Sequence, residues 1–423
     1  MIRCFSHSSM VRMRRPSLLF HYAEEKHHVV RMSTAGSSTM DIDSYAIFSK
    51  NQYDAHRLTR DLLEASMKRL AIRCKLEDEA EQRTNRQRRL IADLGSADGS
   101  SSLATLDFAV ASLQRNYNTS DGSPLPLNIT FEEHPASDKE KLKSTLEAKK
   151  EWFERNDIRW SVLMKSFYEP LFERESVDFL MSYICLHWLD TTAVPEGENI
   201  SHWKSLGDED KAFAGDWVQI NEATTPVLVQ EAWRSKLASD HLAKFLALRA
   251  REMKPGSEML LVMVGHPHDF VTLPDGGPGL LTRAMNRCIN RGELRREVLD
   301  RTVVPYFLRT TDDVIAAVKI AETLEIKVDT NPERIETPGS MLSLVECRSI
   351  AAVTRSDGDG TMDGIFDLYW SIHVNSVQTA NPSDDELVSI KTETRRIFDE
   401  VYDAKDGVPS TFVACTLRRN EKQ

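Results

Sequence analysis

The chain has 423 residues, of which 41% are hydrophobic and 28% are charged, and its formal net charge is −11 at pH 7. This length exceeds that of the usual single hydrophobic core, so we expect a core domain with a sizeable insertion or cap. The acidic balance argues against nucleic acid as a partner, because binding to the phosphate backbone needs clustered Lys and Arg. The sequence contains no run of 18 or more apolar residues, so it predicts neither a transmembrane helix nor a membrane partner.

The first 40 residues are rich in Arg and Ser and contain only two acidic residues. This composition is typical of an organellar transit segment, and it fits equally well an extension upstream of a start at Met32 or Met40. We therefore separate residues 1–43 as an N-terminal extension. The rest of the chain is expected in the cytoplasm, or in an organelle if the extension is a transit segment.

The first predicted elements after the extension are a helix, a strand and a Gly-rich turn. Apolar residues at near-helical spacing predict an amphipathic helix over residues 57–73. The apolar run 90–92 then leads into Asp93 and predicts a buried strand. Gly95 and Gly99 allow a tight turn with close backbone approach, and the serines that follow can cap the next helix. This turn predicts a small-molecule binding loop, with an ordinary strand-to-helix turn as the alternative, because its spacing is not the dinucleotide fingerprint Gly-x-Gly-x-x-Gly.

Six more short apolar runs predict six further strands, and a helix-like segment over residues 144–154 stands between two of them. These runs lie at residues 129–133, 160–164, 178–185, 259–264, 341–345 and 411–417. Strands that alternate with helices form a parallel, doubly wound sheet. The predicted fold class is therefore α/β, with a mostly parallel sheet of seven strands.

The segment 266–340 is too long for an ordinary crossover between strands, and its pattern is mostly helical. We interpret it as a cap over the active site. The predicted organisation after the extension is thus an α/β core over residues 44–265, the cap over 266–340, and a C-terminal part of the core sheet over 341–423.

Five short motifs stand in a characteristic order along the chain. They are Ser44-Tyr45-Ala46 with Ser49 and Gln52, Ser166-Phe167-Tyr168, Leu186-His187-Trp188-Leu189, Phe245-Leu246 with Arg249 and Glu252, and Pro255-Gly256. Together with the loop after Asp93, they resemble the SABATH family of S-adenosylmethionine-dependent carboxyl and nitrogen methyltransferases, from residue 44 to the C-terminus. The resemblance implies a class I methyltransferase fold, which is Rossmann-like, and a homodimer.

The resemblance also implies S-adenosylmethionine as cofactor and assigns residues to it. Asp93 lies where the family binds the methionine portion, and Gly95 and Gly99 give backbone access. Glu133 matches the acid that accepts hydrogen bonds from the ribose hydroxyls, one methylene longer than usual, and His134 replaces an apolar residue near the adenine. The remaining matches are Tyr45 near the transferred methyl, Ser49 near the cofactor carboxylate, and Ser166 and Phe167 as a hydroxyl and an aromatic wall for the adenine.

For the methyl acceptor, Gln52 and Trp188 match two residues that hold the substrate carboxylate through an amide and an indole donor. They imply that a small, largely apolar carboxylic acid is converted to its methyl ester. A carboxylate with a pKa of about 4 is already ionised at neutral pH, so no general base is required. We therefore expect His187 to be a pocket wall or a positioning residue. Ile184 stands where the family often has tyrosine and predicts an altered substrate preference.

A metal site and two other functions complete the hypotheses. Some family members carry Mg²⁺ at an Asp-x-Phe-Asn segment of the cap, where this chain keeps only Asp300 and has Val303, which offers no oxygen ligand. The sequence thus argues against Mg²⁺, with Asp300 as the weak candidate. Transfer to a ring nitrogen of a heterocycle stays open, although Gln52 speaks against it. A non-catalytic relative that binds the cofactor or an acid also stays open, because the chain departs from the family pattern at Lys165, His134, Ile184 and Val303.

Overall fold

The structure is a computed structural model that describes residues 50–80, 87–118, 122–189, 217–268, 271–328, 331–354, 362–403 and 405–421. Tyr45, Ser49 and the predicted extension 1–43 lie outside the described residues. The described residues belong to one unit of the chain, residues 37–423.

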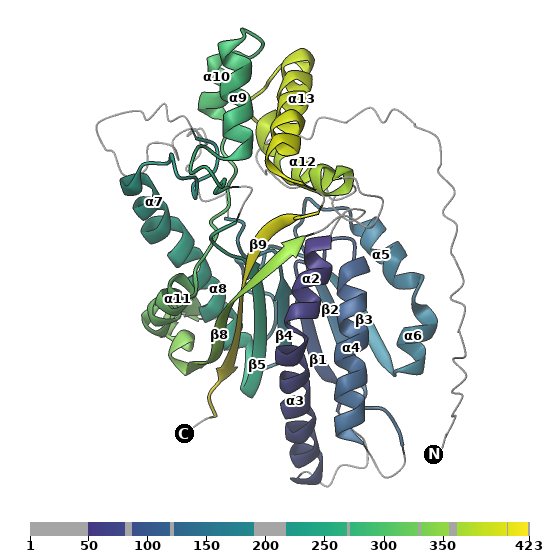
Figure 1. Cartoon of the computed structure of the whole chain (residues 1–423). Helices are drawn as coiled ribbons and strands as arrows, with labels where there is room; N and C mark the ends of the chain where they lie inside the picture. The colour runs from purple at the N-terminus through teal and green to yellow at the C-terminus, as the bar shows by residue number, and fades with distance from the viewer. Residues whose placement is uncertain are drawn as a thin grey trace, which may run out of the picture. The chain divides into compact units, whose positions relative to one another are not determined.

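A seven-stranded sheet, in the order β3-β2-β1-β4-β5-β9-β8, forms the centre of this unit (Figure 1). Strands β1 to β5 are parallel, whereas β9 is antiparallel to both β5 and β8. The seven strands are β1 (Arg89–Leu94), β2 (Leu127–Glu133), β3 (Ile158–Met164), β4 (Val177–Tyr183), β5 (Met253–Val264), β8 (Leu342–Thr354) and β9 (Val408–Arg419). The predicted doubly wound α/β fold is confirmed. Strand order reverses beside β1, and ligands of such sheets bind outside the carboxyl ends of the strands at this point.

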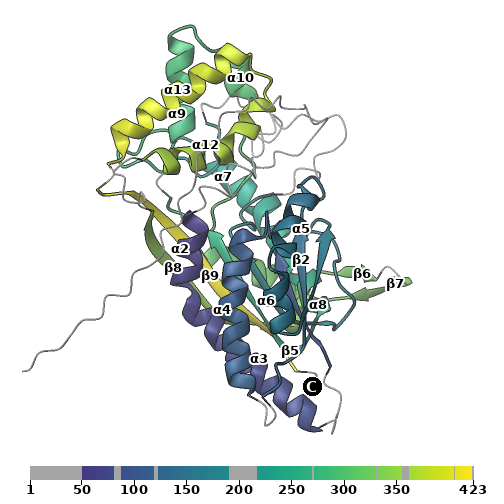
Figure 2. The ribbon, with the colours of Figure 1, turned by 90° about the vertical axis from the view of Figure 1, so that its right-hand side faces the viewer.

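Helices cover both faces of the sheet. Ile91 belongs to the hydrophobic cluster that includes α3 and α4, and its neighbour Ala92 belongs to the cluster that includes α8 and α11. Helices α3, α4 and α8 can be found by their labels in Figure 2. Because central parallel strands are buried on both faces, they read as continuous apolar runs in the sequence. The helices are α2 (Lys50–Leu58), α3 (Arg60–Ala80), α4 (Ser100–Tyr117), α5 (Lys139–Glu147), α6 (Lys150–Arg155), α7 (Val227–Trp233), α8 (Ser239–Glu252), α9 (Leu280–Asn290), α10 (Arg296–Arg301), α11 (Thr311–Thr323), α12 (Asp363–Gln378) and α13 (Asp384–Val401).

Three local predictions differ from the structure. The helix expected over 57–73 is divided between α2 and α3 at Thr59, and the pattern over 144–154 is divided between α5 and α6. The expected serine cap of α4 is wrong, because Gly99 itself is the N-cap residue, with a φ of 83° and no side-chain capping bond. Ser100 instead bonds Asp98, whose Oδ1 accepts from the Ser100 hydroxyl at 2.7 Å.

Helices α9, α10, α12 and α13 lie beyond the carboxyl ends of the parallel strands and share one hydrophobic cluster (Figure 1). Two of them, α12 and α13, follow residue 340, so they fall outside the predicted cap range. Conversely, α11 lies inside 266–340 but packs with α8 against the sheet. A hairpin of β6 (Ile326–Val328) and β7 (Asn331–Glu336), which the sequence did not predict, also falls in that range. Helices α9, α10, α12 and α13 form one helical layer, which is built from two segments that are distant in the sequence. The limits of this layer therefore differ from the predicted cap boundaries at 265 and 340.

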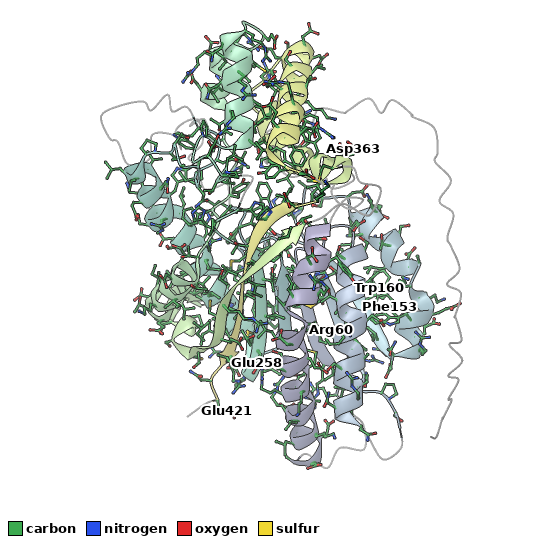
Figure 3. All side chains as sticks on the ribbon, in the orientation of Figure 1. Arg60, Phe153, Trp160, Glu258, Asp363 and Glu421 are labelled. Carbon is green, nitrogen blue, oxygen red and sulfur yellow. The ribbon has the colours of Figure 1, made fainter. Side chains whose placement is uncertain are left out.

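Charged residues link α3 and β9 to β5 at the end of the sheet opposite the helical layer. Glu258 on β5 accepts hydrogen bonds from Arg69 of α3 and Arg418 of β9, each as short as 2.6 Å. Figure 3 shows Glu258 towards the lower end of the sheet and Asp363, the first residue of α12, at the other end. None of the helices among the described residues combines the length and the apolarity of a membrane span.

Candidate cofactor and acceptor site

The loop between β1 and α4 is shaped by two glycines that an alanine could not replace without strain. Gly95 and Gly99 have φ values of 78° and 83°, in the left-handed region that favours glycine. A Cβ placed on Gly95 would lie 2.6 Å from Sγ of Cys185, the second residue after β4. The backbone of the loop is therefore packed directly against the segment that follows β4.

Asp93 lies at the carboxyl end of β1 and is 3% exposed. Its Oδ2 accepts a hydrogen bond from Ser96 Oγ at 2.9 Å. Burial raises the pKa of Asp93 to about 6, although hydrogen bonds from Ser102 and Ser96 oppose the rise. The carboxylate is consequently charged at pH 7 while being held away from solvent.

A pocket opens beside this loop and brings together three of the predicted site residues, Gln52, Asp93 and Gly95. The other lining residues are His56, Ser96, Ser101, Ser102, Thr105, Met181 and Tyr183. Gln52 and His56 are four residues apart on α2 and therefore share one face of that helix. Sequence reasoning missed His56, although this spacing from Gln52 was a signal that could have found it.

Two glutamates end β2 beside the same loop. Glu132 is fully buried, its Oε2 accepts from the Gly95 amide at 3.0 Å, and burial raises its pKa well above the usual value. The Oε1 atom of Glu132 has no hydrogen-bond partner among the described residues. Glu133 is half-buried and accepts from the Ala97 amide and from Ser137 Oγ at 2.9 Å. The predicted ribose acid thus lies at the expected strand end, where it contacts the loop.

His134 and the segment after β3 lie next to Glu133. The His134 amide donates to Glu133 Oε1 at 2.9 Å, and its Nδ1 accepts from the Ala136 amide at 3.2 Å. The Lys165 amide donates to the Glu133 carbonyl at 3.0 Å, which places Ser166 beside the end of β2. These residues do not line the pocket of Gln52 and Asp93, so their contacts with the adenine stay a prediction.

A buried ion pair on α8 contacts the backbone of Phe167. Arg249 donates to the Phe167 carbonyl at 2.9 Å and pairs with Glu252 at 2.8 Å, and both charged side chains are at most 1% exposed. Glu252 also accepts from the Leu171 amide at 2.7 Å. The Phe167 ring contacts that of Phe245, with centroids 6.0 Å apart. The Arg249 and Glu252 motif of the sequence therefore fixes the loop that carries Ser166 and Phe167.

We expect Arg249→Met to lower the free energy of unfolding by about 3–5 kcal/mol, because removing one partner of a buried pair leaves an uncompensated charge. Urea unfolding measures this change. The matched control is Arg296→Met, since Arg296 pairs with Asp300 while their side chains are 42% and 32% exposed. That control should cost less than about 1 kcal/mol. Equal losses in the two variants would contradict the role given to burial.

The segment after β4 carries His187 and Trp188 and is bridged to the segment around Tyr306. Trp188 pairs with Tyr306 in an isolated antiparallel bridge, and their ring centroids are 5.6 Å apart. Trp188 Nε1 and His187 Nδ1 are buried and have no hydrogen-bond partner among the described residues. Burial, with the nearby Arg309 cation, lowers the pKa of His187 to about 3. His187 is therefore neutral near pH 7, and beside it stands an indole donor that no described residue satisfies.

Arg309 holds this segment in place from the interior. It is 1% exposed and donates to the Leu186 carbonyl at 2.6 Å and to the Ala238 carbonyl at 2.7 Å. Ile184 adopts a φ of 53°, which is rare for a β-branched residue, and its side chain is buried in the core cluster. The change at position 184 therefore fills the core, and its predicted effect on substrate preference stays a prediction.

Comparison with known proteins decides which family this site belongs to. A family model described as SAM dependent carboxyl methyltransferase matches residues 29–367. The chain belongs to this family. The resemblance inferred from the motifs is therefore confirmed.

Individual relatives of this carboxyl methyltransferase family are distant. Loganic acid O-methyltransferase of Catharanthus roseus is 23% identical over 292 residues, which are 66% of this chain and 72% of the relative. Gibberellic acid methyltransferase 2 of Arabidopsis thaliana is 27% identical over 246 residues, 54% of this chain and 58% of the relative. A solved structure of loganic acid methyltransferase with SAH has a TM-score of 0.66 at 15% identity and covers 93% of this chain and 99% of that chain. The fold is thus the class I methyltransferase fold.

In this family member, the weak Mg²⁺ candidate lies in an ordinary ion pair. Asp300 accepts from Arg296 Nε at 2.9 Å on α10, and Val303 is buried in an apolar cluster. Within the described parts of the chain, no group of three or more His, Cys, Asp or Glu residues is arranged to hold a metal. The described residues therefore do not support Mg²⁺ at Asp300, because they bring no set of oxygen ligands together there.

Proposed function

We propose that this carboxyl methyltransferase family member transfers the methyl group of S-adenosylmethionine to the carboxylate of a small, largely apolar organic acid. The family match supports the reaction, and the names of the two relatives, which act on loganic and gibberellic acids, support the acceptor class. The observation that carries the proposal is the buried indole donor of Trp188, which has no partner among the described residues and stands beside a neutral histidine. A homodimer, implied by the resemblance, is part of the same proposal.

The residues around the first loop fit the cofactor. The glycine at position 95 lets the loop backbone pack against Cys185, where a Cβ would collide, and charged Asp93 lines the same pocket, where a cation can pair with it. When bound, S-adenosylmethionine supplies an electrophilic methyl group on a positively charged sulfur.

The protein's own contribution is orientation. Gln52 and Trp188 would each donate a hydrogen bond to the acceptor carboxylate and so aim one of its oxygens at the methyl group. The carboxylate is already ionised at neutral pH, so neutral His187 has no proton to remove and acts as a wall. Alignment and exclusion of water can supply roughly 7–11 kcal/mol of the barrier reduction.

Transfer of labelled methyl from S-adenosylmethionine to a panel of carboxylic acids tests the proposal, with mass spectrometry to locate the label. We expect a methyl ester from at least one acid. Label on the ring nitrogen of a heterocycle, with none on any acid, would favour the N-methyltransferase alternative. Binding of the cofactor without transfer to any acid would favour the non-catalytic one.

Cofactor affinity should fall in acid. Burial raises the pKa of Asp93 to about 6, so below that pH the carboxyl becomes neutral and loses its attraction for a cation. Because protonation competes with the ligand, affinity should fall by up to about tenfold per pH unit below pH 6. Because the pKa of Asp93 is higher in the folded state than in the unfolded state, the charged carboxylate destabilises the folded state at neutral pH. Protonation below pH 6 removes this destabilising contribution. The loss of binding is thus separate from unfolding.

Calorimetric titration of S-adenosylhomocysteine between pH 5 and pH 8 measures this dependence. Asp93→Asn is the control, because it should bind weakly at every pH and lose the dependence on pH. Equal affinity of the unmodified protein at pH 5 and pH 8 would refute the role of Asp93.

A further inference from the structure

His56 is a pocket residue to which neither the family resemblance nor the comparisons give a role. It lines the same pocket as Gln52 and Asp93 and lies one helical turn after Gln52 on α2. Its ring meets the edge of Tyr183 at a centroid distance of 4.4 Å, at the end of β4. The imidazole therefore extends from α2 to contact α4 and the end of β4, and it lines the pocket.

The contact with Thr105 sets which nitrogen of His56 carries the proton. Thr105 Oγ1 lies 2.6 Å from His56 Nδ1, whereas it lies 3.3 Å from the Ser101 carbonyl. The hydroxyl has one proton: either it goes to the Ser101 carbonyl and Nδ1–H donates to Thr105 Oγ1, or it goes to Nδ1 over the shorter contact and Nδ1 is the acceptor. Burial lowers the pKa of His56 to about 4, so near neutral pH the ring is uncharged and carries a single proton. Where Thr105 donates to Nδ1, that proton is on Nε2, which leaves an N–H donor.

The other pocket groups divide into a negative and a positive side. Asp93 supplies a carboxylate. Ser101 and Ser102 lie in the first turn of α4, an 18-residue helix whose N-terminus favours negative charge. A ligand end that carries both an ammonium and a carboxylate matches this division, since the ammonium can pair with Asp93 and the carboxylate can lie between α4 and His56.

We propose that His56 donates a hydrogen bond from Nε2 to the α-carboxylate of the amino-acid end of S-adenosylmethionine or S-adenosylhomocysteine, with Thr105 fixing the donor tautomer. This inference rests on the proposed use of S-adenosylmethionine. It adds His56 to Asp93 and Ser49, the residues already predicted for the amino-acid end, and explains why a threonine faces the imidazole.

Calorimetry at pH 7.5 with two ligands tests the inference. S-adenosylhomocysteine carries the amino-acid end, whereas 5′-methylthioadenosine keeps the adenosine and the thioether but lacks both charged groups. His56→Phe should weaken S-adenosylhomocysteine about 10- to 100-fold, as expected for a lost hydrogen bond to a charged group, and should leave 5′-methylthioadenosine within about threefold. Thr105→Val should weaken S-adenosylhomocysteine by a smaller factor, because the ring then divides between its two tautomers.

Two further variants serve as controls for the His56 donor. His56→Gln, which retains an N–H donor, should recover part of the lost affinity. Tyr53 lies on the exposed side of the same helix and is 65% exposed. Tyr53→Phe should change the affinity for neither S-adenosylhomocysteine nor 5′-methylthioadenosine. Equal weakening of both ligands by His56→Phe would mean that the ring only shapes the pocket and would overturn the inference. Unchanged S-adenosylhomocysteine affinity with a raised KM for the acid would overturn it in favour of an acceptor contact. An unmodified protein that binds neither ligand would instead overturn the proposed cofactor.

Discussion

Gly95→Ala is expected to abolish measurable binding of S-adenosylhomocysteine and to lower the free energy of unfolding by about 2–5 kcal/mol. Two costs add. A left-handed backbone costs a residue with a Cβ about 1–2 kcal/mol, and overpacking costs about 1–3 kcal/mol more. The overpacking arises because the new Cβ would lie 2.6 Å from Cys185 Sγ and 2.8 Å from Cys185 Cβ. The collision would separate the loop after β1 from the segment after β4, which lie on either side of the site. Urea unfolding and calorimetry measure the two effects.

Gly122→Ala isolates the steric part of this prediction. Gly122 has a φ of 68°, yet a Cβ there meets no atom of the described residues within 4 Å. This control should therefore lose only the backbone term of about 1–2 kcal/mol and should bind the cofactor normally. The double variant Gly95→Ala/Cys185→Gly should recover part of the loss, because both clashing atoms are removed. If the two alanine variants lost equal stability and bound equally well, the close approach to Cys185 would have no consequence.

The loop after β1 could be predicted from sequence because its determinants are contiguous. An apolar run predicts the strand, Asp93 ends it, and two glycines permit the left-handed turn. The capping prediction failed inside the same stretch, since the serines after Gly99 are good caps by composition but Gly99 already occupies the capping position. Local chemistry thus predicted the loop and left its hydrogen bonds undetermined.

Features that depend on distant contacts could not be predicted in this way. The motif residue Arg249 acquires its role by contacting the Phe167 carbonyl, 82 residues away in the chain. In the helical layer, α9 and α10 pack with α12 and α13, although strand β8 lies between these two pairs in the sequence. The apolar face of a helix does not indicate which other helix it packs against. His56 likewise becomes interpretable only once Thr105 is seen beside it.

For Trp188, the sequence predicted the role of the side chain but not its environment. The resemblance named it as a carboxylate donor, but only the structure reveals that its Nε1 is buried with no partner among the described residues. An internal partner would have satisfied the donor before any substrate arrived. Among the described residues nothing satisfies this desolvated N–H, so removing the donor should lower activity and leave stability nearly unchanged.

We expect Trp188→Phe to lower kcat/KM for the acid about 10- to 100-fold, because a hydrogen bond to a charged group contributes about 1.5–3 kcal/mol. The free energy of unfolding should stay within about 1 kcal/mol of the unmodified value, since relief of an unsatisfied buried donor, which costs about 1–3 kcal/mol, offsets the smaller apolar surface. Cofactor affinity should not change, because the lost contact belongs to the acceptor. Steady-state kinetics, urea unfolding and calorimetry give the three readouts.

Trp152→Phe is the matched control, because the same atoms are removed from a donor that is already satisfied. Trp152 Nε1 donates to Asp107 Oδ1 at 2.7 Å on α6, away from the pocket. Its loss should cost about 0.5–1.5 kcal/mol of stability and leave kcat/KM unchanged. A Trp188 variant that lost activity only in proportion to lost stability would show that the ring supports the fold and that its N–H does not bind the acid. The opposite pattern, activity lost with stability kept, is what an indole donor reserved for the acceptor carboxylate requires.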